Sequence, residues 1–385
     1  MTAPSQRSAS PRRRRRGLVA VTVGVLLAGV AGCTGGEPAG GAAHSAGSGS
    51  RPGSAAPGSA AAPAEQGAAA GATLTGKPGP TGPVIVIKVD NVPSAQPLQR
   101  GLDAAALVYQ EVVEGGITRF MAVYVGAGTT VVGPVRSVRD TDLAILAPYG
   151  RVVLGFSGAN AGVLAHVRAA DLLEVPYDYV HKPFWVAGRR REAFNIYTTP
   201  DRLLATAGDG AADVRDVGLR FGPASAGGAP VTAPVTVAFS YRTTVTLSYD
   251  APTRTWRLRQ NRRPLRQADG TVVAPANVVV QRVSVRTGRY VDKAGYASPD
   301  TQVIGTGALS VYRDGRRFDG TWSRPRLDST TRYLGPDGRD IPLAPGQTWI
   351  LLAPERPIGP SGPAARPFVT PTTTGTGGGV AARTR

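Results

Sequence analysis

The chain has 385 residues, a formal net charge of +18 and a single cysteine, Cys33. One cysteine excludes both a disulfide framework and a cysteine-ligated metal site. Of the three histidines, His44 lies outside the predicted folded region, so a histidine-rich metal site is not expected. No sequence pattern predicts a cofactor.

The N-terminus has the three parts of a bacterial lipoprotein export signal, which we predict for residues 1–32. Arg12–Arg16 hold the start of the chain on the anionic cytoplasmic side, and the apolar run Leu18–Val30 is shorter than the ~20 residues that a stable spanning helix needs. Small Ala31-Gly32 then lets a peptidase reach the bond before Cys33. We therefore expect cleavage, a diacylglycerol on the Cys33 sulfur and a fatty acyl group such as palmitate on the new N-terminus. The alternatives are an uncleaved anchor with an inert thiol and, for export, the twin-arginine route instead of the general one.

Low-complexity sequence follows the cysteine and also ends the chain. Residues 33–82 are almost wholly Gly, Ala, Ser and Pro, with too little apolar bulk to offset the entropy of ordering them, and predict a disordered tether. Residues 357–385 predict a disordered tail. Without Arg7 and Arg12–Arg16 of the leader, the mature chain keeps +12 of the formal +18.

The export signal decides how this positive charge is interpreted. A basic chain often binds nucleic acid, but an exported one meets lipid headgroups and wall polymers instead. We therefore expect the outer face of the cytoplasmic membrane as the location. The membrane is an expected partner through the lipid anchor, a wall polymer or envelope protein is a further candidate partner, and nucleic acid is not.

Residues 83–207 have the alternating pattern of an N-terminal α/β domain. The β-branched run Val84–Val89 predicts a buried strand whose carboxyl end presents Asp90-Asn91. A tight-turn signal, Glu114-Gly115-Gly116, separates two of the strands that follow. The elements predicted after the first strand are strands at 106–113, 117–125 and 152–156 and a short helix at 140–149. This alternation favours a mixed α/β layer structure.

Residues 234–356 predict a mostly β C-terminal domain, joined to the first by a crossover linker at 208–233. Short apolar runs there lie between Gly, Pro, Asn and Asp turns. The predicted strands are 245–249, 256–259, 278–285, 307–312 and 349–352. Residues 217–221 of the linker are compatible with one further strand. The expected fold class is mixed α/β, a layered N-terminal α/β part followed by a mostly β C-terminal part.

Seven blocks of sequence carry a family resemblance. They are Val89-Asp90-Asn91 and residues 101–111, 114–120, 133–139, 320–322, 336–338 and 345–350. In this order they resemble the YerB-like lipoproteins of bacteria, which have a two-part domain of unknown function. The resemblance covers nearly the whole folded region and implies an exported lipoprotein with an α/β part and a β-rich part, without an established activity. Where the family has Pro-His-Asn, this chain has Ala193-Phe194-Asn195, which argues against a histidine-based mechanism there.

Three carboxylates are candidates for chemistry or binding. Glu111 and Glu114 flank the glycine turn and, with Asp90, could supply the protonated and ionised carboxyl groups that glycan cleavage needs. On a continuing strand the two glutamates would point to opposite faces, so they can converge only if the strand stops near Val113. The simpler interpretation is a set of ion pairs with nearby arginines, Arg119, Arg136 and Arg139. The third interpretation is that these residues bind a ligand without catalysing a reaction.

The segment Gly133–Arg139 is the second candidate cluster. If Ser137 caps a helix that starts near Val138, the helix amides and the arginines could hold a phosphate or carboxylate, although a Gly-Pro turn before a capped helix is also ordinary architecture. No lysine follows a glycine loop as nucleotide binding would need. The complete candidate polar site is Asp90, Asn91, Glu111, Glu114, Arg119, Arg136, Ser137, Arg139 and Asn195.

A basic segment, Arg254–Arg263, alternates as a strand does. Trp256 and Leu258 fall on one face, and Arg257 and Arg259 fall on the other. In the structural interpretation, Trp256 and Leu258 face the core and the arginines form a solvated, charged strand edge. In the functional interpretation, the arginines form a contact surface for an anionic wall polymer. The candidate basic surface consists of Arg257, Arg259, Arg262 and Arg263.

Together these features predict an extracytoplasmic, membrane-tethered lipoprotein that binds or scaffolds at the cell envelope. Its expected target is wall glycan, an anionic polymer or a wall-synthesis protein. The alternative is a wall-active glycan hydrolase or lytic transglycosylase that uses Asp90, Glu111 and Glu114. A cleft with two carboxyl groups about 5 to 10 Å apart, one of them hard to ionise, would favour the enzyme. Carboxylates each paired to arginine would favour the binding module.

Overall fold

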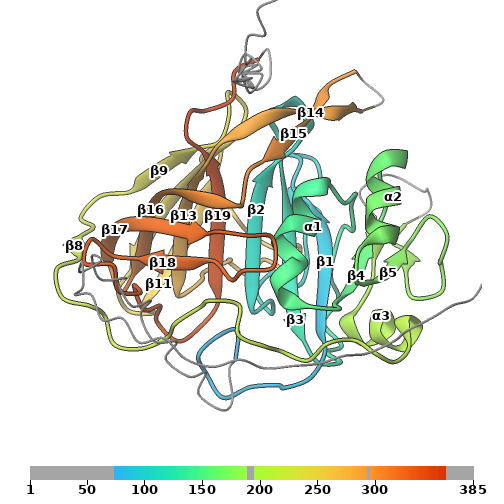
Figure 1. The fold of residues 1–385 in the computed structure, drawn as a ribbon, viewed down its shortest axis with the longest axis horizontal. Coiled ribbons are helices and arrows are strands. Elements are labelled where there is room, and N and C mark those ends of the chain that lie inside the picture. The colour runs from blue at the N-terminus through green and yellow to red at the C-terminus, as the bar shows by residue number, and fades with distance from the viewer. Residues whose placement is uncertain (1–72, 189–194, 293–294, 361–385) are drawn as a thin grey trace, which may run out of the picture. The chain divides into compact units, whose positions relative to one another are not determined.

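The computed structural model of the chain describes residues 73–188, 195–292 and 295–360 (Figure 1). The predicted signal peptide, the predicted lipidation site Cys33 and most of the predicted tether and tail lie outside the described residues. The described residues form one compact unit.

Both low-complexity predictions extend too far into the folded chain. Leu74, within the predicted tether, is buried, and the neighbouring Thr75 carbonyl oxygen accepts a hydrogen bond from the Gly346 backbone. Ile358, within the predicted tail, is buried as well, and its carbonyl oxygen accepts a hydrogen bond from the Tyr241 backbone. In both places one large apolar side chain packs into the core and so holds a Gly- and Pro-rich segment whose other side chains bury little apolar surface.

The described residues form three α-helices, three short 3-10 helices and nineteen strands. The 3-10 helices are η1 (Gln96–Leu98), η2 (Glu114–Gly116) and η3 (Ala147–Tyr149). The α-helices are α1 (Asp140–Leu146), α2 (Ala161–Ala169) and α3 (Pro200–Ala207). The strands of the first part are β1 (Val84–Asp90), β2 (Leu107–Val112), β3 (Thr118–Val125), β4 (Val153–Phe156), β5 (Leu173–Pro176), β6 (Trp185–Val186) and β7 (Ile196–Tyr197). Those of the second part are β8 (Ala229–Pro230), β9 (Val235–Ala238), β10 (Thr244–Asp250), β11 (Thr255–Gln260), β12 (Arg263–Pro264), β13 (Asn277–Val283), β14 (Val285–Val291), β15 (Ala297–Thr301), β16 (Gly305–Arg313), β17 (Arg316–Arg324), β18 (Arg332–Leu334) and β19 (Thr348–Pro354).

One large sheet runs through both parts of the chain. Its strand order is β18-β17-β16-β13-β19-β2-β3-β1-β4-β5, with β8 paired to β17. The parallel pair of β19 and β2 joins the parts, with Thr348 opposite Leu107 and Leu351 opposite Gln110. The predicted fold class, a mixed α/β part followed by a mostly β part, is confirmed, and the two parts share a sheet.

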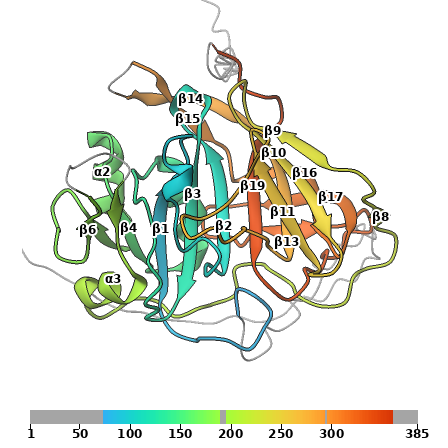
Figure 2. The ribbon, with the colours of Figure 1, turned by 180° about the vertical axis from the view of Figure 1, so that it is seen from behind.

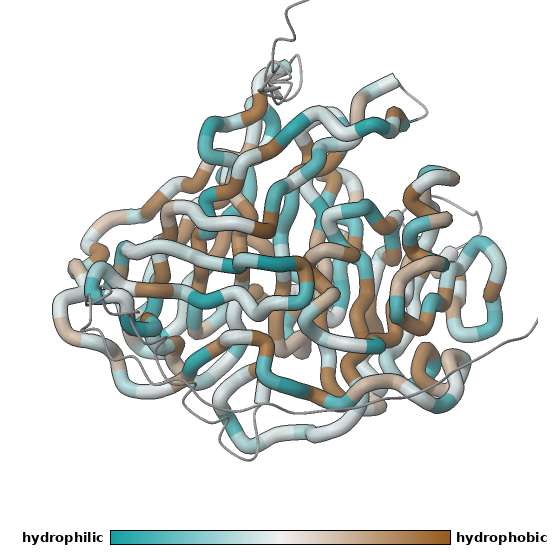
Figure 3. Tube along the Cα trace, in the orientation of Figure 1, coloured by the Kyte–Doolittle hydropathy of each residue, from teal (hydrophilic) through white to brown (hydrophobic). Residues whose placement is uncertain are grey.

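Different layers cover the two faces of this sheet (Figures 1 and 2). On one face, Val84 and Val86 of β1 share a core with Ile145 of α1 and Val163 of α2. On the other face, alternate β1 residues share a core with Leu203 of α3 and with the four-stranded sheet of order β12-β11-β10-β9. Because both faces are covered there, the central strands β1, β13 and β19 are buried along nearly their whole length. Figure 3 shows hydrophobic segments in brown within the body of the molecule.

The first strand shows most directly how sequence sets the site. Every residue of β1 is buried, which the β-branched run predicts. Only Lys88 and Asp90 interrupt this apolar run with charge. Because they are two residues apart, both point to the face that α1 covers. Two charges are therefore placed in the interior, where they need partners.

Candidate functional site

Strand pairing aligns three of the predicted polar residues. Arg119 of β3 lies opposite Asp90 of β1 on one side and opposite Glu111 of β2 on the other. Directly opposed residues of antiparallel strands project to the same face. These three side chains therefore share one end of the sheet, on the face covered by α1.

A buried lysine holds two carboxylates beside this row. The Lys88 Nζ donates to Glu111 Oε1 at 2.7 Å and to Asp142 Oδ1 of α1 at 2.6 Å. Lys88 and Asp142 are 0% exposed and Glu111 is 1% exposed, so water screens none of these charges. Burial and the Asp142 carboxylate raise the pKa of Glu111 to about 7, although the Lys88 ammonium opposes the shift. This Lys88–Glu111–Asp142 triad lies outside the predicted site apart from Glu111, and a lone lysine in an apolar strand is the signal that would have found it.

The Glu111 shift predicts a pH dependence of stability. The ordinary pKa of 4.5 applies to the unfolded chain and about 7 to the folded one, so the folded protein binds more protons between these values. Stability should therefore fall as the pH rises through this window, by about 3 kcal/mol for the whole shift. Urea unfolding from pH 5 to 8 should show that Glu111→Gln removes most of this fall. The exposed Glu355→Gln variant is the control, and an unchanged slope in Glu111→Gln would contradict the assignment.

Glu114 lies in a turn directly after β2. The strand ends at Val112, as convergence of the two glutamates requires, and Gly115 has a φ of 66° that favours glycine. Both Glu114 oxygens accept hydrogen bonds from Arg139, at 2.6 Å each, and Ser298 donates to one of them. Although burial alone would raise it, these bonds lower the pKa of Glu114 to about 2. Glu114 is therefore an ionised partner of Arg139.

Asp90 also has a cationic partner. Its Oδ2 lies 2.9 Å from Nε of Arg136, whose side chain is 29% exposed, while Asp90 itself is 0% exposed. Arg119 lies close by and donates to the Ser137 carbonyl oxygen. Burial, together with the Arg139 charge, lowers the pKa of Arg119 to about 10. The three predicted carboxylates thus each face a cation, and for Glu111 that cation is a lysine.

Asn91 belongs to a different network. Its side chain points to the opposite face from Asp90, as neighbouring strand residues do. There its amide donates to Thr118 Oγ1 at 2.8 Å and to Gln260 Oε1 of β11 at 2.7 Å, and Gln110 also donates to Thr118. This buried network ties the large sheet to the four-stranded sheet, which is a structural role.

Two further predicted site residues have other surroundings than expected. Helix α1 begins at Asp140 with Arg139 as the preceding residue, so Ser137 does not cap it. The Asp142 carboxylate accepts the Arg139 backbone N–H at 2.7 Å and so occupies this helix end itself. Asn195 lies next to β7, where its amide donates to the Ala187 carbonyl oxygen at 2.8 Å.

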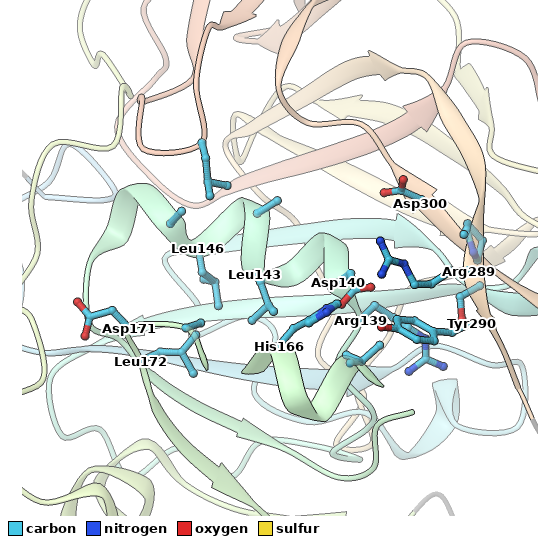
Figure 4. Close-up of a pocket in the computed structure, with 18 of the residues that line it drawn as sticks. Arg139, Asp140, Leu143, Leu146, His166, Asp171, Leu172, Arg289, Tyr290 and Asp300 are labelled. Carbon is cyan, nitrogen blue, oxygen red and sulfur yellow. The ribbon is translucent and has the colours of Figure 1, made fainter. Parts of the chain in front are cut away.

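A cavity of about 650 Å³ opens beside the Glu114–Arg139 pair, between α1, α2 and the β14–β15 hairpin (Figure 4). Its middle is apolar, and charged side chains line its ends. The lining residues are Arg139, Asp140, Leu143, Ala144, Leu146, Ala147, Gly150, Val163, His166, Ala170, Asp171, Leu172, Arg215, Gly288, Arg289, Tyr290, Ser298, Pro299, Asp300 and Leu327. We call this cavity the α1–α2 pocket.

One end of the α1–α2 pocket is built by contacts between the helices and the hairpin. The His166 Nδ1 lies 2.9 Å from the Asp140 carboxylate, and the His166 ring lies 6.1 Å from the Tyr290 ring. Tyr290 lies directly against Gly162, where a Cβ atom would meet its ring, so glycine lets the hairpin approach α2. Of the predicted polar site, Arg139 lines this pocket. No single motif could have identified it, because the helices and the hairpin that form its walls are more than a hundred positions apart in the sequence.

The candidate basic surface lies at the turn between β11 and β12. Trp256 and Leu258 are buried and Arg257 and Arg259 are exposed, as the alternation predicts. Arg257 pairs with Asp250 at 2.9 Å, and the Arg259 guanidinium donates to the Arg262 carbonyl oxygen. Arg262 and Arg263 are exposed as well. This surface therefore keeps a positive excess.

The described residues lack two features, a metal-binding cluster and a membrane-spanning helix. Within 73–188, 195–292 and 295–360, no group of three or more His, Cys, Asp or Glu side chains is arranged to hold a metal ion. In the same ranges no helix combines the length and apolar character needed to cross a bilayer.

Comparison with known proteins gives consistent matches to both parts. Residues 71–213 match the N-terminal domain, and residues 235–350 the C-terminal domain, of the family described as protein of unknown function (DUF3048). A Bacillus subtilis (strain 168) protein named "Putative lipoprotein YerB" is 25% identical over 291 residues, 71% of this chain and 81% of that protein. The crystal structure of YerB protein from Bacillus subtilis matches with a TM-score of 0.59 at 21% identity, over 73% of this chain and 92% of that chain. At that identity the structural likeness concerns the fold.

Proposed function

The chain belongs to the DUF3048 family, and on that premise we propose that it is an envelope lipoprotein that binds a ligand in the α1–α2 pocket. The export signal before Cys33 and the name of the Bacillus subtilis relative support lipid anchoring. The proposed location is the outer face of the cytoplasmic membrane. From there the tether lets the folded part meet wall components.

The observation that carries the binding role is the pairing of the carboxylates beside an open cavity. Asp90 is 0% exposed and Glu111 is 1% exposed, and Glu114 is held by two hydrogen bonds from Arg139. A substrate cannot reach the first two, and the third is neutralised. The adjoining pocket has a volume within the range of ligand sites, which is about 300 to 1,000 Å³.

One observation favours the alternative, a glycan hydrolase. Glu111 and Glu114 have pKa values displaced in opposite directions, to about 7 and about 2, which is the pattern of a general acid and its ionised partner. Their positions argue against this role, because the Lys88 bond and the core around it separate Glu111 from solvent. We therefore interpret the raised pKa as a consequence of a crowded buried charge cluster.

The exposed arginines of the basic surface are proposed as a second contact, with an anionic wall polymer. Arg259, Arg262 and Arg263 make no ion pair with another described residue, and Arg257 is the one that does. Such contacts on the surface are individually weak and screened by salt. They would hold the domain near the wall without selecting a ligand.

Filling the α1–α2 pocket tests the binding role. Ala144 lines the pocket from α1, so Ala144→Trp places an indole in the cavity. We expect the lipidated variant to lose most of the envelope material that the wild-type protein captures, measured by pull-down with muropeptide and protein mass spectrometry.

The matched control is Ala165→Trp, which adds the same bulk at an exposed position of α2. It should capture the wild-type set. Circular dichroism and thermal melting identify a variant that has not folded. A folded Ala144→Trp variant with undiminished capture would refute the pocket as the binding site.

A further inference from the structure

We propose that the ligand of the α1–α2 pocket is a short peptide with a free ammonium and a free carboxylate group. This inference rests on the proposed binding function and names its ligand class. Three properties of the pocket lead to it: its charge balance, an arginine and an aspartate without partners at one end, and its apolar middle.

The charges that line the pocket are balanced. Three arginines and three aspartates contribute to its wall, Arg139, Arg215, Arg289, Asp140, Asp171 and Asp300. A site for a polyanion, such as a phosphate polymer, would carry an excess of arginine or lysine. The basic surface on β11 and β12 has such an excess, and this pocket does not. Its formal neutrality suits a ligand that carries both signs.

Three of these charges, those of Arg215, Arg289 and Asp300, have no ion-pair partner among the described residues, and Arg215 lies against Gly150. Asp171 lies 3.6 Å from Arg151. Arg139 is occupied by Glu114, and Asp140 is in contact with His166. In contrast, within the described ranges the Arg289 guanidinium and the Asp300 carboxylate make no ion pair or side-chain hydrogen bond, and Arg289 lies only loosely over the Tyr290 ring, 5.9 Å from its centre.

Figure 4 shows Arg289 and Asp300 at the same end of the pocket, on the two strands of the hairpin. A guanidinium is a good partner for a carboxylate, and a carboxylate is a good partner for an ammonium group. The pair thus offers one contact to each charged group of a zwitterion.

The apolar middle of the pocket argues against a sugar as the ligand. Leu143 and Leu146 of α1, Val163 of α2 and Leu172 form its wall together with Leu327. A sugar carries hydroxyl groups around its ring, and these would lose hydrogen bonds to water against such a wall. The methyl groups of small peptide side chains would instead gain from burial there.

Calorimetric titration with defined probes tests the ligand class. The probes are trialanine with free ends, N-acetylated trialanine, trialanine amide, the trimer of N-acetylglucosamine, and polyphosphate. We expect trialanine to bind, and each blocked form to bind about tenfold more weakly, because it lacks one hydrogen bond between charged groups. Equal binding of blocked and free peptides, or binding of the sugar or polyphosphate in their place, would overturn the proposal.

Two variants assign the contacts. Arg289→Ala should weaken trialanine binding about tenfold and remove the preference for a free carboxylate, while Asp300→Asn should remove the preference for a free ammonium group. Arg316→Ala is the control, since Arg316 is an exposed arginine of β17 that does not line the pocket, whereas Arg286 lies directly opposite Asp300. It should bind trialanine as the wild type does. Unaltered preferences in both pocket variants would refute the proposed contacts.

The peptide titration and the Ala144→Trp pull-down fail in distinguishable ways. If Ala144→Trp abolishes capture of envelope material but trialanine does not bind, the peptide proposal is wrong and the binding function stands. If Ala144→Trp captures the wild-type set, the binding function itself is wrong.

Discussion

Lys88→Met is expected to lower the free energy of unfolding by about 3 to 5 kcal/mol, the typical cost of removing one partner from a buried ion pair. The lysine donates to both Glu111 and Asp142, and all three side chains are buried. Methionine has a similar length but no charge, so it leaves two carboxylates in the interior without their cation. Urea unfolding at pH 7.5 measures the loss.

Two controls separate this electrostatic effect from a packing effect. Lys77→Met makes the same change at an exposed position and should alter stability by no more than about 0.5 kcal/mol. The deficit of Lys88→Met should also shrink at pH 5, because carboxylates without a cation take up protons and lose their buried charge. A loss below about 1 kcal/mol, or one independent of pH, would show that Lys88 does not hold the triad together.

Cys33→Ala is expected to move the protein almost completely from the membrane fraction to the soluble or secreted one. Cys33 is the only cysteine of the chain and lies outside the described residues. Each buried methylene of an attached acyl chain contributes about 0.8 kcal/mol to membrane binding, so losing the acylation site removes the whole anchor. Fractionation with immunoblotting measures the change, and mass spectrometry of the mature N-terminus shows whether the lipid is present.

The neighbouring Thr34→Ala variant is the control for Cys33→Ala. It changes a residue of the same segment without removing the sulfur, and it should stay in the membrane fraction. Unchanged membrane partition of Cys33→Ala would contradict lipidation, as would an intact leader with an unmodified thiol in the natural protein.

Much of the fold could be predicted because its strands are short and strongly apolar. The run Val84–Val89 predicts β1 to within one residue, and the Glu114-Gly115-Gly116 turn separates β2 from β3 as expected. Helices α2 and α3 were not among the predicted elements, although Thr199-Pro200 is a recognisable helix start. Short helices with few apolar residues give a weak periodic signal.

The candidate site could be predicted only in part. The row formed by Asp90, Arg119 and Glu111 follows from strand pairing, and the Arg139 partner of Glu114 belongs to the predicted set. Lys88 was not expected as the cation shared by Glu111 and Asp142, because these residues lie 23 and 54 positions further along the chain. Spacing along one strand carries no information about such a contact.

The sequence by itself predicted the export signal and determined the family and the alternation of most strands, since each depends on residues that are neighbours along the chain. The α1–α2 pocket, the sharing of one sheet by both parts and the partners of each buried charge depend on packing. The pocket arises where α1, α2 and the β14–β15 hairpin meet, and the helices and the hairpin are more than a hundred positions apart. A charged side chain in the interior must be paired, but which partner reaches it is a property of three-dimensional contact.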